Sequence, residues 1–134
     1  MRATPDTYAH FSVDTMMFTS TFDSPFPLLY TKRFYSGDPG ADLAQKSNNW
    51  APQNFLKWKN DNYNQLYDQV KSETDVQKAA QLWMQLNDIV VNAYVSIPLV
   101  DRKFADAKAK SIKGPNPGPF DSVFAWNIGE WARG

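Results

Sequence analysis

Hydrophobic side chains recur at helical spacing in the middle of the chain. Four apolar residues stand at i, i+3, i+4 and i+7, the spacing of one buried helix face: Tyr63, Leu66, Tyr67 and Val70. This pattern predicts a helix that Asp61 or Asn62 caps and that ends at about Ser72.

A second apolar run with the same spacing follows directly. Thr74, with Gln77 three residues later, predicts a capping box, and the pattern then predicts a helix from Asp75 to about Asn92. We expect its apolar face to comprise Val76, Ala79, Ala80, Trp83, Leu86 and Val90. We expect its solvent face to comprise Lys78, Gln81, Gln85 and Asp88. The two apolar faces are expected to pack against each other as a core, because nothing marks them as a cofactor site.

Other segments favour strands or irregular chain. Residues 13–19 and 94–100 are rich in β-branched and apolar residues and predict strands, with Pro98 placing the second at a sheet edge or a strand end. Residues 104–110 alternate loosely with alanine and are a third strand candidate. Prolines and glycines predict turns or loops at 23–27, 37–40, 48–52 and 114–119. The apolar tail at 120–131 needs a surface to cover.

Composition narrows the classes of function. Because 14 basic and 14 acidic residues give no net charge, nucleic acid is not expected as a partner. The chain has no cysteine, which excludes disulfides and thiolate chemistry, and its single histidine, His10, argues against a histidine-based metal site. Since no catalytic or phosphate-binding motif is present either, we expect a protein that is not an enzyme and that uses no cofactor or metal.

The aromatic content is high, with nine Phe, six Tyr and five Trp, and so many rings must pack together or face a ligand. Asp23 stands between Phe22 and Phe26 in the proline-stiffened loop, where its carboxylate is well placed to pair with a ligand ammonium. The alternative is an Asx-turn in which Asp23 accepts a hydrogen bond from the backbone N–H of Phe26. Asp61 and Asp68 are expected to be capping or solvated residues.

Three segments, taken in order, carry a resemblance to a known family. They are MMFTSTFDSPFP at 16–27, the run from NFLKWKND to SIPLVDR at 54–102, and KSIKGPNPGPFDSVFAWNIGEW at 110–131. The first is similar to a strand followed by an Asp-x-Pro-Asp-Pro type loop, the second to a helix pair and an "-IPL-" strand, and the third to a closing segment with a Trp-Asn pair. Together they resemble the C-terminal part of the family 5 extracellular solute-binding proteins, the peptide/nickel class of ABC importers.

The resemblance implies a fold and a function. The fold is α/β: a C-terminal fragment of a two-lobed periplasmic-binding-protein-like (type II) fold, with a mixed sheet and two packed helices. Residues 1–102 would be the C-terminal part of the second lobe, and residues 103–134 a crossover and tail returning to the first. The whole protein would capture a small solute, favoured to be a peptide, between its lobes and deliver it to a membrane permease. In peptide-binding members, the acidic residue at the position of Asp23 pairs with the ligand's α-ammonium.

Two departures from the family pattern widen the ligand class. Phe26 replaces the second acidic residue of the loop, and Ser20 stands where an aromatic residue is common. A sugar, an opine or a modified peptide is therefore an alternative ligand, and Trp50 and Trp58 would serve as stacking faces.

The resemblance also implies a location and partners. The protein would be periplasmic or extracellular and would meet the membrane through the importer, its signal peptide lying upstream of this chain. The N-terminal portion of the same protein would complete the fold. On its own, the fragment is expected to self-associate through exposed strand edges and its aromatic tail.

Two other functions remain open on the sequence. The chain could be a self-contained protein-interaction domain that docks its aromatic tail on a partner. It could also be a small enzyme that uses Asp23 with His10.

Overall fold

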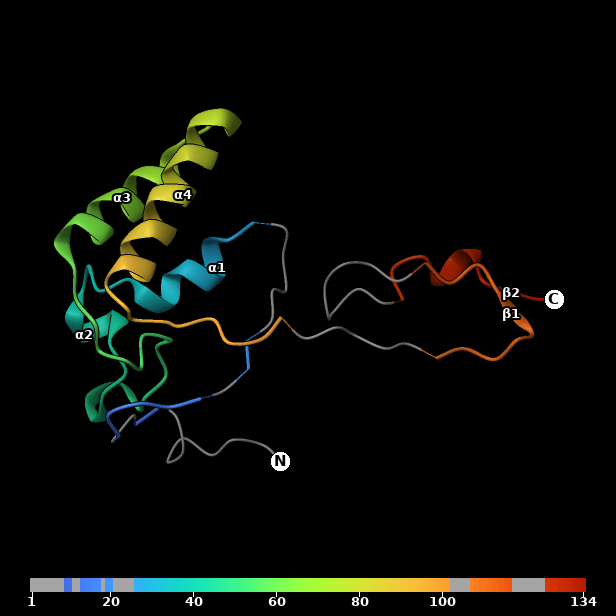
Figure 1. The fold of residues 1–134 in the computed structure, drawn as a ribbon, viewed down its shortest axis with the longest axis horizontal. Coiled ribbons are helices and arrows are strands. Elements are labelled where there is room, and N and C mark those ends of the chain that lie inside the picture. The colour runs from blue at the N-terminus through green and yellow to red at the C-terminus, as the bar shows by residue number, and fades with distance from the viewer. Residues whose placement is uncertain (1–8, 11–12, 18, 21–25, 102–106, 117–124) are drawn as a thin grey trace. The chain divides into compact units, whose positions relative to one another are not determined.

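The computed structural model describes residues 9–10, 13–17, 19–20, 26–101, 107–116 and 125–134 (Figure 1). The chain divides into two compact units. The first comprises residues 1–18 and 26–97, and the second comprises residues 19–25 and 98–134. The sequence-based boundary at 102–103 falls on residues outside those described.

A helix pair, α3 and α4, dominates the first unit (Figure 1). Helix α3 spans Asp61–Ser72 and α4 spans Val76–Asn92, so both predicted helices are confirmed to within a residue at each end. The N-caps differ from the prediction. Asn60, rather than Asp61 or Asn62, caps α3 by accepting a hydrogen bond from the backbone N–H of Tyr63 at 2.9 Å.

The predicted capping box at the start of α4 is also wrong. Asp75 is the N-cap, and its carboxylate accepts hydrogen bonds from the backbone N–H groups of Gln77 at 2.9 Å and Lys78 at 3.1 Å. The backbone N–H of Thr74 donates instead to the side chain of Glu73. A carboxylate beside the N-terminus also interacts favourably with the helix dipole, which a threonine hydroxyl does less well.

The core lies between the two helices and the segment before them. Its buried members are Phe34, Tyr63, Tyr67, Val70, Leu82, Leu86 and Val90. The predicted face of α3 is confirmed. That of α4 is confirmed in part: Leu86 and Val90 are buried, but Val76 is 77% exposed, and Leu82, which was not predicted, is buried. Because an α-helix has about 3.6 residues per turn, the side chains of Val76 and Leu82 point about 120° apart around the helix axis. The predicted solvent face of α4 is exposed throughout.

Short turns build the segment from Leu28 to Asn60. Helix α1 spans Leu28–Thr31, a 3₁₀ turn covers Lys32–Phe34, α2 spans Pro39–Asp42 and another 3₁₀ turn covers Lys46–Asn48. The predicted turn at 37–40 forms as the start of α2. Asp38 caps it through Gly40 N–H at 2.9 Å, and Pro39 takes the first helical position, where its missing N–H costs nothing.

The second unit contains a two-stranded antiparallel sheet. Strand β1 (Ile112–Lys113) pairs with β2 (Ala132–Arg133), Ile112 lying opposite Arg133. Buried Asn127 supports the pair by donating to Gly114 O at 2.8 Å and accepting from the indole N–H of Trp131 at 3.0 Å. Gly114 has φ 99°, and a Cβ there would lie 2.8 Å from Glu130 O, so this crossing requires glycine.

The strands predicted elsewhere do not form among the residues that the structure describes. Residues 13–17 and 19, residues 94–100 and residues 107–110 are all irregular or in turns. Tyr94 has φ 54°, in the left-handed region, which ends α4 and is incompatible with a strand. A strand requires a neighbour for its backbone hydrogen bonds, and within the described residues none of these segments has one.

Candidate functional site

The ligand-binding residues expected from the sequence fall into different places. Phe22 and Asp23 lie outside the described residues, so their predicted pairing with a ligand ammonium stays a prediction. Phe26 lies two residues before α1 and is 72% exposed. Trp50 and Trp58 belong to two separate clusters.

Trp58 is part of the aromatic core. Its ring meets Tyr63 edge-on at 5.4 Å between centroids and Phe34 at 6.4 Å, and the side chain is half-buried. Edge-to-face contacts of this kind stabilise a core by about 0.5–1.5 kcal/mol beyond their buried area. The Trp58 ring, which the sequence analysis predicted as a stacking face for a ligand, thus contacts two aromatic side chains of the core.

Trp50 has a different environment. The imidazole of His10 lies against its indole, with centroids 3.9 Å apart and planes tilted by 38°. The ammonium of Lys57 lies 5.3 Å from the centroid of the Trp50 ring and donates a hydrogen bond to His10 O at 3.1 Å. Trp50 and Lys57 therefore form one cluster, the Trp50 cluster, with His10 from a distant part of the chain, around a half-buried indole.

The backbone of this cluster is strained. Asn49, Trp50 and Lys57 have φ values of 53°, 58° and 57°, all in the left-handed region. For a bulky residue such as tryptophan this conformation is a genuine outlier, costing on the order of 1–2 kcal/mol. Such strain persists only where the surroundings impose it, and it gathers at functional sites.

Two side-chain amides impose this conformation on the loop. Gln45 donates to Pro39 O and Gly40 O, both at 3.1 Å. Asn48 donates to Gly40 O at 3.0 Å and to Leu43 O at 2.7 Å. The backbone N–H of Trp50 then donates to Gln45 O at 3.0 Å. The loop that presents Trp50 is thus fixed to α2 on one side by hydrogen bonds.

Asn54 closes the base of the same loop. It is fully buried, and its amide donates to Tyr35 O at 3.0 Å and to Trp58 O at 2.9 Å, while its own backbone carbonyl accepts from Ala44 N–H. No described residue donates to its side-chain oxygen, Oδ1. A buried acceptor without a donor lowers folding stability by about 1–3 kcal/mol. Among the described residues, Asn54 therefore joins two backbone segments through its amide while its Oδ1 has no donor.

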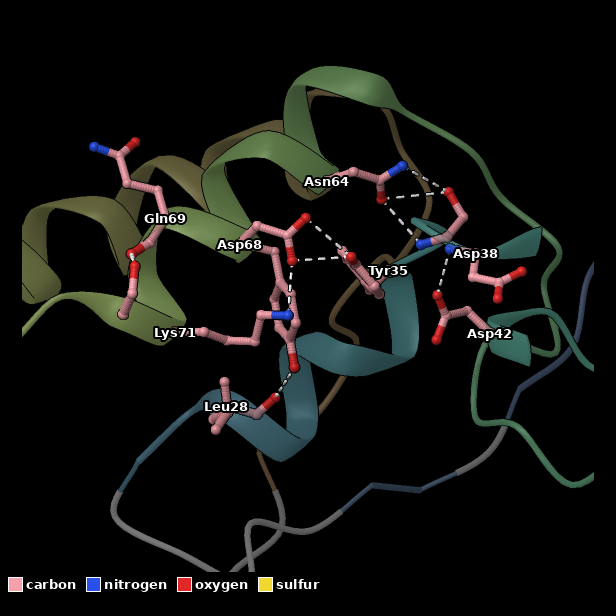
Figure 2. A network of polar contacts seen from close by, with 11 residues as sticks. Leu28, Tyr35, Asp38, Asp42, Asn64, Asp68, Gln69 and Lys71 are labelled. Atoms are coloured by element: carbon pink, nitrogen blue, oxygen red, sulfur yellow. Dashed lines mark hydrogen bonds and ion pairs between the residues drawn. The ribbon is translucent and has the colours of Figure 1, made fainter. Parts of the chain in front are cut away.

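A second polar cluster joins the segment before α2 to α3 (Figure 2). The Tyr35 hydroxyl donates to Asp68, lying 2.9 Å and 3.0 Å from its two carboxylate oxygens, and Lys71 pairs with Asp68 at 2.7 Å. The Lys71 ammonium also lies 5.3 Å and 5.5 Å from the ring centroids of Tyr35 and Tyr67. Asp68 is exposed, as expected of a solvated residue, and its contacts also connect these elements.

Protonation states in this second cluster are fixed. Burial, assisted by the hydrogen bond to Asp68, raises the pKa of Tyr35 to about 12. The hydrogen bond from Lys71 is the main cause that lowers the pKa of Asp68. Both shifts favour a neutral Tyr35 hydroxyl that donates to an ionised Asp68 carboxylate, which is the arrangement of their hydrogen bond.

The described residues hold no grouping suited to a metal, and no described helix is both long and apolar enough to cross a bilayer. The sequence gives no sign of the Trp50 cluster as a unit, because His10 stands far from Lys57 along the chain. The chain matches no protein-family model, no curated protein and no solved structure.

Proposed function

We propose that this chain is part of the substrate-binding protein of an ABC importer, which captures a small solute between two lobes and delivers it to a membrane permease. A peptide is the favoured ligand. Binding requires lobe closure and no covalent chemistry, so the protein is not an enzyme.

The observation that carries the proposal is the order of three sequence segments that resemble the family 5 solute-binding proteins. The middle segment, 54–102, resembles a helix pair, and the described helices Asp61–Ser72 and Val76–Asn92 lie within it. The proposal assigns the remaining portion of the two-lobed fold to the rest of the same protein. It places the mature protein in the periplasm or outside the cell.

The proposed ligand contact is an ion pair in a proline-stiffened loop. Asp23 would pair with the α-ammonium of a peptide, and Phe22 and Phe26 would supply apolar surface beside it. Removing one partner of a buried ion pair costs about 2–5 kcal/mol, partly because the other charge is left without a partner.

Calorimetry on the complete gene product tests this contact. Tri-alanine is expected to bind, whereas its N-acetylated form, which has no ammonium, is expected to bind far more weakly. Asp23→Ala should reduce affinity for tri-alanine by the roughly 2–5 kcal/mol expected for such a pair, which is about 30-fold or more. Asp14→Asn is the matched control, since it removes an exposed carboxylate from the preceding segment. Equal binding of both peptides, or unchanged affinity in Asp23→Ala, would contradict the proposed contact.

A second candidate function is a protein-interaction domain that uses its aromatic tail. It is favoured by one observation: Trp126 and Ile128 of the second unit are 59% and 61% exposed. The reading frame upstream of Met1 separates the two candidates. Continuous coding sequence for a signal peptide and a further lobe supports the importer, whereas a stop codon and a ribosome-binding site directly before Met1 support the interaction domain.

A further inference from the structure

His10 is held at the Trp50 cluster in the manner of a bound peptide residue. Its side-chain ring lies against the indole at 3.9 Å, and its backbone carbonyl accepts a hydrogen bond from Lys57 Nζ at 3.1 Å. The two contacts use a planar side chain and a main-chain carbonyl, and neither depends on a property found only in histidine. Any peptide residue with a planar side chain offers the same pair of groups.

The two residues that contact His10, Trp50 and Lys57, are held in place by the backbone around them. Trp50 and Lys57 both adopt left-handed backbone conformations, and the hydrogen bonds of Gln45 and Asn48 fix the loop that carries the indole. A loop with only a structural role would meet the same backbone requirement with glycine or asparagine at lower cost. Tryptophan in this conformation therefore points to a role for the ring itself.

The Lys57 ammonium adds electrostatic selectivity. At 5.3 Å from the Trp50 centroid it is within the range of a cation–π contact, which holds the lysine beside the ring. From there it donates to a carbonyl oxygen, and it would donate more strongly to a terminal carboxylate. The surface thus combines a flat apolar face with one fixed donor.

We propose that Trp50 and Lys57 form a subsite for one peptide residue with a planar side chain, which binds by displacing His10. This inference rests on the proposed function, because it assigns the subsite to the peptide ligand of the same protein. The ligand ring takes the place of the imidazole, and the ligand carbonyl takes the place of His10 O.

The test uses a small probe that carries both groups, N-acetyl-phenylalaninamide, with N-acetyl-leucinamide as the non-planar control. The readout is the NMR signal of the Trp50 indole N–H, assigned through Trp50→Phe, together with saturation transfer from the protein to the ring of the probe, which also reports binding in variants that lack this indole. His10→Ala should bind the phenylalanine probe about tenfold more tightly than wild type does, as expected when a competing ring contact is removed. The leucine probe should bind more weakly to either protein.

Further variants assign the binding to the subsite. Adding Trp50→Leu to His10→Ala should abolish binding, and adding Lys57→Met should weaken it. Tyr94→Leu, which removes an aromatic side chain that is 79% exposed, should leave it unchanged. If His10→Ala does not fold, as judged by circular dichroism, His10→Leu keeps an apolar side chain there and should show the same gain. No binding to a folded His10 variant, or binding that survives the loss of Trp50, would overturn the subsite.

The complete gene product separates this inference from the proposed function. Peptide binding that is lost in Asp23→Ala but is equal in wild type and Trp50→Leu for every aromatic peptide would leave the function standing and reject the subsite. Binding of the phenylalanine probe through Trp50, without any peptide binding by the complete product, would reject the function and the assignment of the subsite to a peptide ligand, and would leave only a surface that binds an isolated planar residue.

Discussion

Tyr67 provides a direct test of the described core, because its protonation is coupled to folding. The side chain is 3% exposed, and burial raises its pKa to about 12, against about 10 for an unperturbed tyrosine. The folded state therefore favours the neutral phenol. This contribution is fully present below about pH 10 and is lost as the pH rises through about 12.

The expected size of the effect follows from the two pKa values. At about pH 12 the unfolded chain has released nearly all of this proton and the folded chain about half, so folding loses about 2 kcal/mol relative to about pH 8. Tyr67→Phe removes the ionisable group and also the 3.2 Å hydrogen bond to Leu28 O, which costs about 1 kcal/mol. The variant should thus be less stable than wild type at about pH 8 and more stable, by about 1 kcal/mol, at about pH 12.

Urea unfolding followed by far-UV circular dichroism, repeated from about pH 8 to about pH 12, measures this crossover. Tyr94→Phe is the matched control, since it removes a phenol that is 79% exposed. A stability difference between Tyr67→Phe and wild type that stays constant with pH would refute the argument. It would mean that the phenol is not buried as a neutral group in the folded chain.

Three further substitutions test the helix pair and the second unit. Leu86→Ala should destabilise the first unit by about 2–5 kcal/mol in urea unfolding because Leu86 is fully buried, whereas Met84→Ala on the same helix removes a side chain that is 59% exposed and should cost far less. Asp75→Ala should cost about 1 kcal/mol as the loss of an N-cap, and Thr74→Ala should cost clearly less; the reverse order would restore the predicted capping box. Asn127→Ala should unpair β1 and β2, seen as faster amide exchange at their paired residues, and unchanged exchange would show that the pairing does not depend on this side chain.

The helices could be predicted because their determinants are local. Apolar spacing and capping residues lie within one or two turns of each other, so the sequence specifies them without knowledge of distant contacts. The errors were small and have a clear origin. Neighbouring polar residues compete for each cap, and Asn60 and Asp75 prevail because their side-chain oxygens reach the first free N–H groups of the helices.

The clusters could not be predicted, because they depend on contacts between distant parts of the chain. The Trp50 cluster needs His10, and the connection between Tyr35 and Asp68 spans two segments separated by several turns. Spacing along the chain carries no signal for either. The left-handed conformation of Trp50 could not be predicted either, because glycine and asparagine are the residues from which such a conformation is normally predicted.

The segment at 94–100, which the sequence predicts as a strand, offers a way to distinguish the two candidate functions. Ile97, Leu99 and Val100 are 67%, 67% and 80% exposed, and no described residue exchanges a backbone hydrogen bond with them. Strand-forming residues in this state favour pairing with another strand. The importer proposal requires such a strand from the rest of the protein, so these amides should be protected from exchange in the complete gene product. An interaction domain that uses only its tail makes no such demand, and fast exchange of the Ile97, Leu99 and Val100 amides in the complete product would favour it.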